Sequence, residues 1–284
     1  MHGWTRMKSL VPLGLAATAT ALQVLRLADD RCARAAWSRL RDAPKAEPAR
    51  FDPRMVLNLP DPARRYFLHS IAPGTPLRRV AEIETVGAIG LGTKEKPNYL
   101  PMRASQILAA PHGFVWRVQA ELGMMRLSGF DAYAEGRGQT RFWLLNTVPV
   151  ARAGGGADFA RSAAARGIAE ALFWTPAALL PGPGIAWEPA SADTARLRVD
   201  HLGERFAVDL TVAGDGRPRS LVLQRWSREN RERAWRFQPF GGTVEATGGV
   251  DGYRVATRVE GGNHFGTKDY FPFYRASVTK LTFY

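Results

Sequence analysis

Two parts of the chain show a regular alternation of apolar and polar residues. In the first part, residues 114–121 place Phe114, Trp116 and Val118 at every second position. In the second, residues 205–212 repeat this pattern with Phe206, Val208 and further apolar residues. A period of two is typical of a β-strand with one buried face. Similar runs lie at 79–91, 125–127, 140–144, 197–199, 221–223, 244–247, 253–259 and 275–284, so both parts predict a series of strands.

The segment between the two series, residues 159–181, has a different period. Its apolar residues share one stripe of a helix, and prolines at 176 and 181 end it. Asp158 is the candidate N-terminal cap. The stripe consists of Phe159, Ala163, Ile168, Ala171 and Leu172. This is the one long helical run in the predicted domain.

Few long crossovers separate the predicted strands, which favours antiparallel pairing. We therefore expect an α+β fold: a strongly curved antiparallel β-sheet, or half-barrel, with one central helix at 158–174 packed on its concave face. A single domain is expected from residue 59 to residue 284. It would open with a short helix capped by Asp61, with Pro62 at the first helical position.

The N-terminal residues resemble a targeting segment. Arg6 and Lys8 precede an apolar stretch at 9–22, and Ala19-Thr20-Ala21 fits a signal peptidase site. Residues 1–28 are therefore predicted to be a signal or signal-anchor, and residues 29–58 a helix that passes into a linker. A cell-envelope location follows, either membrane-anchored or periplasmic and secreted. The alternative is an amphipathic helix that lies on the domain or on a membrane surface.

Composition and charge narrow the classes of partner. The chain has 284 residues, is 45% hydrophobic and carries a net charge of +13, so it can fold around a core and favours anionic surroundings. Arginines at 217–236 alternate with Trp226 and Trp235, a composition that can bind nucleic acid or acidic lipid headgroups. Because Glu229 and Glu232 dilute this charge, we favour a solvated hairpin and expect no nucleic-acid partner. A membrane surface is the expected anionic partner.

Sequence motifs give little support to catalysis or to a metal site. The five histidines lack metal-ligand spacing, Cys32 is the single cysteine, and a nucleophile elbow is absent. No cofactor or metal is expected. The least implausible enzyme would be a hydrolase or isomerase that uses Glu170 with His264 or Asp131. A non-enzymatic function is favoured over it.

Candidate ligand-binding residues lie on the central helix and on the strands. Glu170 lies at an otherwise apolar helix end and would anchor a ligand or act as an acid. The alternative is a carboxylate that pairs with an arginine of the sheet or caps backbone amides. The aromatic candidates, which would line either a ligand cavity or an ordinary core, are Phe173, Trp174, Trp116, Phe142 and Phe206.

Several short motifs of the chain resemble a bacterial family of unknown function. The element in which Glu170 precedes Trp174 and Pro176 is the most specific of them. The others are Leu59-Pro60 with Arg65-Tyr66, Ala104-Ser105-Gln106, Phe114-Val115-Trp116, Ala178-Leu179, Trp187 and Asp215-Gly216. The resemblance covers most of residues 59–284 and implies no activity. The layout of strands, helix and strands also resembles the half-barrel of bacterial lipoprotein carriers, which hold acyl chains between a concave sheet and a helix.

Together these features predict a protein that binds an apolar or amphiphilic ligand, for example a lipid, at the cell envelope. A curved sheet lined by large apolar residues has more apolar surface than one short helix covers. The N-terminal segment and the basic charge add proximity to a membrane. A structural or interaction protein without a ligand is the alternative, and it predicts a filled interior.

Overall fold

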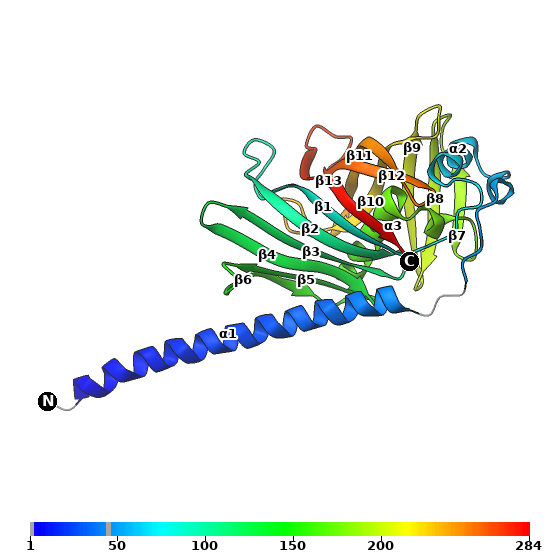
Figure 1. Cartoon of the computed structure of the whole chain (residues 1–284). Helices are drawn as coiled ribbons and strands as arrows, with labels where there is room; N and C mark the ends of the chain where they lie inside the picture. Colours follow the sequence, from blue (N-terminus) through cyan, green and yellow to red (C-terminus); the bar gives the residue numbers. More distant parts are fainter. Residues whose placement is uncertain (1–2, 44–46) are drawn as a thin grey trace.

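A computed structural model describes residues 3–43 and 47–284, with side chains in the first helix described from Ala17 onward. Thirteen strands in this part of the chain form one antiparallel sheet, in the order β6-β5-β4-β3-β2-β1-β13-β12-β11-β10-β9-β8-β7 (Figure 1). The strands of the first half are β1 (Ala81–Gly90), β2 (Tyr99–Ala109), β3 (Gly113–Leu122), β4 (Met125–Ala134), β5 (Arg137–Leu144) and β6 (Val148–Gly154). Those of the second half are β7 (Ile185–Pro189), β8 (Thr194–His201), β9 (Glu204–Val212), β10 (Pro218–Ser227), β11 (Arg236–Val250), β12 (Tyr253–Asn263) and β13 (Phe271–Phe283).

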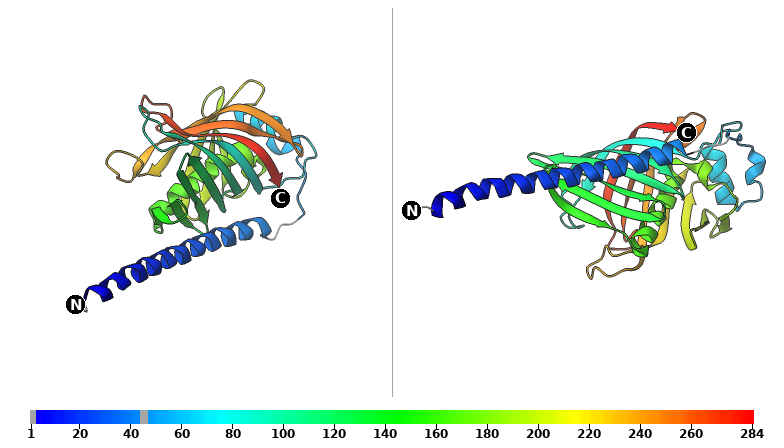
Figure 2. Two further views of the ribbon diagram at one scale, coloured as in Figure 1. Left: turned by 60° about the vertical axis from the view of Figure 1, so that its left-hand side comes forward. Right: turned by 90° about the horizontal axis from the view of Figure 1, so that it is seen from below.

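The sheet consists of two meanders that meet where β1 pairs with β13. Between the meanders, the chain forms α3 (Ala157–Trp174) and the short helix η2 (Pro176–Leu179). The strands curve around α3, which therefore lies on the concave side (Figure 2). The predicted α+β fold, with a curved, open antiparallel sheet and one helix packed on it, is confirmed.

The main hydrophobic core fills part of the space between α3 and the concave face. Ile168 and Leu172 of α3 are completely buried against strand residues such as Phe114. Trp174 donates a hydrogen bond from Nε1 to the Ala256 carbonyl oxygen of β12, at 3.1 Å. Small residues allow α3 to approach the sheet closely. A Cβ atom at Gly138 of β5 would lie only 2.6 Å from the Phe159 carbonyl oxygen.

Both predicted helix caps differ from the observed ones. The cap position of α2 (Asp61–Ser70) is Pro60, and the cap position of α3 is Gly156, which has φ +78°. Asp61 and Asp158 instead lie in the first turns of their helices. There Asp158 accepts a hydrogen bond from Trp226 Nε1 at 2.6 Å, because this indole lies beside the start of α3.

A second apolar cluster covers the convex face of the sheet. Its helix is α1 (Gly3–Asp42), whose residues Ala33 and Ala36 pack against Ile107 and Val115 of β2 and β3. Because side chains alternate along a strand, Val115 faces α1 while its neighbour Phe114 faces α3. The first half of the sheet is therefore covered by a helix on each face (Figure 2).

An ion-pair network fixes α1 to the convex face. Asp29, only 8% exposed, accepts hydrogen bonds from Trp143 Nε1 and Arg152 Nη2, each at 3.1 Å, and lies 3.5 Å from Arg141 Nε. Residues 29–42, the first part of the segment predicted as a helix that passes into a linker, form the end of α1. Ahead of residue 59, Phe51 and Val56 are also buried in the main core.

The N-terminal half of α1 extends beyond the sheet (Figure 1). Much of the predicted apolar targeting stretch at 9–22 lies outside the described side chains, so the assignment of residues 1–28 stays a prediction. The division into segments 1–28, 29–58 and 59–284 stays a prediction as well. Among the described residues, no helix is long and apolar enough to cross a membrane.

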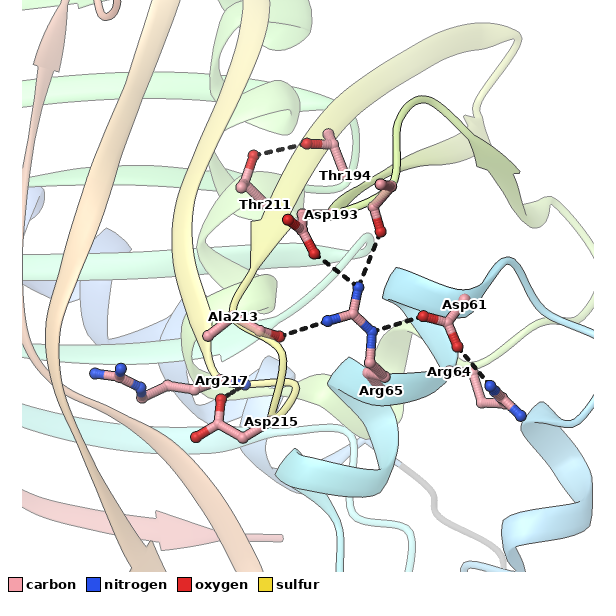
Figure 3. Close-up of polar contacts among 10 residues, drawn as sticks. Asp61, Arg64, Arg65, Asp193, Thr194, Thr211, Ala213, Asp215 and Arg217 are labelled. Atoms are coloured by element: carbon pink, nitrogen blue, oxygen red, sulfur yellow. Dashed lines mark hydrogen bonds and ion pairs between the residues drawn. The ribbon is translucent and has the colours of Figure 1, made fainter.

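Arg65 connects α2 to the second meander (Figure 3). Its Nη1 donates to the Ala213 carbonyl oxygen at 2.7 Å, and its Nη2 lies 3.0 Å from the Asp193 carboxylate. On the same helix, Asp61 contacts Arg65 Nε at 2.7 Å. The Asp215-Gly216 turn lies directly against α2, so two motifs that are distant in sequence form one structural contact.

Gly216 is required at this contact, and replacing it with alanine should be costly. Gly216 has φ +83°, and a Cβ atom would lie 2.1 Å from the Arg65 carbonyl oxygen. We expect Gly216→Ala to lower the free energy of unfolding by about 2 kcal/mol or more, measured by urea denaturation. Gly214→Ala is the matched control, since a Cβ there meets nothing within 4 Å. Equal stability of the two variants would contradict the prediction.

Candidate ligand-binding site

The space between α3 and the concave sheet is not completely filled. A cavity of about 690 Å³ lies there, within the range of about 300–1,000 Å³ that is usual for small-molecule sites. Much of its wall is aromatic. The aromatic lining residues are Phe114, Trp116, Phe142, Phe159, Phe173, Trp174, Trp235, Phe240, Phe271, Phe273 and Tyr274.

A hydrogen-bonded cluster of charged residues lies on one wall of the cavity. Arg166 of α3 donates from Nε to Glu170 at 2.7 Å and from Nη1 to Asp131 of β4, also at 2.7 Å. Gln106 Nε2 donates to the other Glu170 oxygen at 2.5 Å, and Thr140 donates to the other Asp131 oxygen at 2.7 Å. All four carboxylate oxygens therefore have a partner.

The Arg166 guanidinium holds this cluster together. It lies over the Phe114 and Trp116 rings, at 4.9 and 5.2 Å from their centres. Burial alone would lower the pKa of Arg166, but the Glu170 and Asp131 carboxylates outweigh it and raise the pKa. The observed partner of Glu170 is thus an arginine four residues away on its own helix, rather than the sheet arginine considered from the sequence.

Arg225 of β10 is the second arginine of the cavity, and its surroundings differ from those of Arg166. Its Nε donates to Ser162, to both the carbonyl oxygen and Oγ at 3.1 Å, and its guanidinium lies 4.8 Å from the centre of the Phe240 ring. Burial, followed by repulsion from Arg166, lowers the pKa of Arg225 to about 10. The side chain therefore remains charged at neutral pH.

The structure brings together part of the candidate catalytic set. Glu170 and Asp131 meet at Arg166, which occupies both carboxylates. His264 is not among the residues that line the cavity, and its backbone N–H donates to the Pro239 carbonyl oxygen at 2.6 Å. As the cluster stands, its hydrogen bonds suit the positioning of a bound molecule better than proton transfer.

Most of the aromatic candidates line this cavity. Trp116, Phe142, Phe173 and Trp174 do so together with Glu170. Phe206 lies elsewhere: it lines a separate cavity of about 340 Å³ beside several arginines. Ligand contact by any of these residues stays a prediction.

Sequence reasoning missed several lining residues. Arg225, Arg228 and Trp235 belong to the basic stretch for which a solvated hairpin was favoured, yet all three line the cavity. Arg228 lies over the Phe159 and Trp235 rings, at 5.1 and 5.8 Å from their centres. The interleaving of basic and aromatic residues was the available signal, but it did not show which side chains face inward.

Two histidines that are distant in sequence meet outside the cavity. The rings of His112 and His201 lie 5.8 Å apart, and His201 Nε2 is 3.1 Å from the Tyr133 hydroxyl. Burial, followed by the charge of His112, lowers the pKa of His201. In the part of the chain that the structure describes, His, Cys, Asp and Glu side chains form no group of three that could hold a metal ion.

Comparison with known proteins identifies the family. The model of DUF6544, a family of unknown function, matches residues 49–276, so the chain belongs to this family. The predicted resemblance to a family of unknown function is therefore confirmed. The matched region begins ahead of Phe51, in agreement with the burial of that residue in the core. No sequence among the curated proteins matches.

Two solved structures are similar at low sequence identity. A LolA superfamily protein from Nitrosomonas europaea matches with a TM-score of 0.38 and 9% identity, over 78% of this chain and 92% of that one. A putative outer membrane lipoprotein-sorting protein domain from Vibrio parahaemolyticus matches with a TM-score of 0.35 and 11% identity. In that case 72% of this chain and 85% of the other are covered.

Proposed function

We propose that this DUF6544 protein binds an apolar or amphiphilic ligand, for example a lipid, between α3 and the concave face of the sheet. The observation that carries the proposal is the cavity of about 690 Å³ with its aromatic lining. Sites for small molecules are typically concave and mostly apolar, with a few polar groups that orient the ligand. The Arg166 cluster and Arg225 are such polar groups.

The energetics favour an apolar tail as the main source of affinity. Each buried methylene group contributes about 0.8 kcal/mol, so a chain of fourteen carbons would contribute roughly 10 kcal/mol. The polar cluster already satisfies its own hydrogen bonds, which limits the cost of leaving it next to an apolar tail. It would orient the ligand and add little to its affinity.

The cavity favours the proposed function over the alternatives. A purely structural protein was expected to have a filled interior, whereas space remains here between helix and sheet. A hydrolase or isomerase using Glu170 would need this carboxylate to be released from Arg166 and Gln106. Ligand binding requires no release of Glu170 from Arg166 or Gln106.

Native mass spectrometry of the full chain, followed by extraction of copurifying molecules, tests the proposed function. We expect a fraction of the protein to carry additional mass that organic solvent removes and that proves to be an apolar or amphiphilic compound. Protein refolded without lipid should regain the additional mass when incubated with an envelope lipid extract. Absence of any adduct from both preparations would favour the structural alternative.

A location at the cell envelope, on a membrane surface, is part of the proposal. The hairpin turns between β3 and β4 and between β5 and β6 are adjacent, because Leu145 N–H donates to the Arg126 carbonyl oxygen at 2.7 Å. Both turns expose apolar side chains: Leu122 is 60%, Met124 91% and Leu145 54% exposed. The N-terminal half of α1 leaves the domain at this same end (Figure 1).

Exposed apolar turns beside a basic residue, here Arg126, are suited to insertion into an anionic lipid surface. Full-length protein should therefore cosediment with vesicles that contain phosphatidylglycerol. Protein that stays in the supernatant at low salt would argue against this location.

A further inference from the structure

The carboxylates that line the cavity all have basic partners, but not every lining arginine has a carboxylate partner in the part of the chain that the structure describes. Glu170 and Asp131 both pair with Arg166, so these two carboxylates are already neutralised by one shared cation. The other two lining carboxylates also have basic partners. These are Glu229, at 3.8 Å from Arg233, and Glu260, at 3.5 Å from Arg275.

Arg225 has no such partner. In residues 3–43 and 47–284, no carboxylate oxygen lies within 4.0 Å of an Arg225 nitrogen. Its Nε is used by Ser162, while Nη1 and Nη2 find no acceptor among the described residues. The four N–H groups on these two nitrogens are free to donate to a molecule in the cavity.

The Nη groups of this partly buried guanidinium have no acceptor among the described residues, and a ligand that supplied one would form charge-assisted hydrogen bonds with them. The Phe240 ring contacts the guanidinium through a cation–π interaction, which only partly replaces a hydrogen bond to an anionic acceptor. The planar fork of arginine matches the two oxygens of a carboxylate or phosphate, and such paired charge-assisted hydrogen bonds are the strong ones in proteins. A neutral headgroup could not compensate the charge.

We propose that Arg225 is the headgroup anchor of the site, and that the ligand is an amphiphile whose single anionic head, a carboxylate or a phosphate, binds its Nη groups while the tail lies against the aromatic wall. This inference rests on the proposed function and adds the chemical class of the ligand. Arg228, which also lines the cavity and has no ion-pair partner among the described residues, increases the positive charge available to the head.

The test compares ligands that share a tail and differ in the head. Isothermal titration of the full chain with palmitate, hexadecyl phosphate and hexadecanol should show the two anionic ligands binding about tenfold to hundredfold more tightly than the alcohol. This comparison needs only the unmodified protein. Preference between carboxylate and phosphate then identifies the head, and either preference supports the proposal. Inorganic phosphate that binds as tightly as hexadecyl phosphate would overturn it.

Variants at position 225 test whether Arg225 causes the preference for anionic heads. Arg225→Met should remove the preference for anionic heads, whereas Arg225→Lys should keep part of it. Arg219→Met, at an exposed position of the same strand, should change none of the affinities.

The outcomes separate the two proposals. Equal binding of palmitate and hexadecanol would overturn the headgroup inference and leave ligand binding intact. Binding of neither would overturn both. A preference for anionic heads that survives Arg225→Met would assign the anchor to another cation and so overturn the role of Arg225.

Discussion

Replacing Arg166 with leucine is expected to lower the free energy of unfolding by about 3–5 kcal/mol, because it leaves two partly buried carboxylates without their cation. Glu170 is 16% exposed and its surface opens into the cavity, while Asp131 is 24% exposed. Gln106 and Thr140 would still donate one hydrogen bond each, but neither neutralises a charge. Urea denaturation followed by circular dichroism measures the effect.

Two further measurements decide whether burial is the cause. Arg258→Leu removes a pair with a comparably short contact, 2.6 Å to Glu245, whose side chains are 58% and 42% exposed, and should cost less than about 1 kcal/mol. Combining Arg166→Leu with Asp131→Asn and Glu170→Gln should recover most of the lost stability, since no carboxylate then remains unpaired. A loss from Arg166→Leu as small as that from Arg258→Leu would show that water reaches and solvates the carboxylates.

The sequence was sufficient to predict the sheet because its pattern records local burial. Phe114 and Trp116 face α3, while Val115 between them faces the convex side, and this alternation is visible in the sequence. It did not show that both faces are covered. The apolar residues of 113–118 are compatible with one buried face or two, and only the position of α1 decides between them.

The packing of α1 could not be predicted for a related reason. Ala33 and Ala36 are weakly apolar, and the contact depends on Asp29 meeting Arg152 and Trp143, which lie more than a hundred residues further along the chain. Such partners are set by the curvature and twist of the sheet, which the local pattern does not encode. Residues 29–42, for which a helix was predicted, lie on the sheet as part of α1, while the alternative of a surface helix for residues 1–28 stays a prediction.

Only part of the candidate site was predicted, because the sequence pattern records local burial and not contacts between distant strands and helices. Glu170 was identified because it is a carboxylate in an otherwise apolar helix end, and Trp174 because it is an aromatic residue of that same helix end. Arg225 was overlooked because it is one of 39 basic residues, and no property of the sequence distinguishes it. What sets it apart is its place in the cavity wall, where Ser162 of α3 holds Nε and Phe240 of β11 lies beside the guanidinium, and this depends on contacts between α3, β10 and β11.

Filling part of the cavity should weaken ligand binding strongly without unfolding the protein. Ala151 of the edge strand β6 lines the cavity opposite Phe142, so Ala151→Trp would place an indole inside it. The indole would occupy the space of about four methylene groups, each contributing about 0.8 kcal/mol. We therefore expect affinity for a long-chain amphiphile to fall about a hundredfold, measured by titration with palmitate.

The adjacent residue supplies the control for this prediction. Val150, 51% exposed, precedes Ala151 on β6, and its side chain points to the other face because neighbouring residues alternate. Val150→Trp adds the same bulk at the same sheet edge, yet should leave palmitate affinity within about twofold of the unmodified protein. Equal loss in both variants would indicate general disturbance of β6. Unchanged affinity in Ala151→Trp, with an intact fold, would mean that the ligand does not use the part of the cavity beside Phe142.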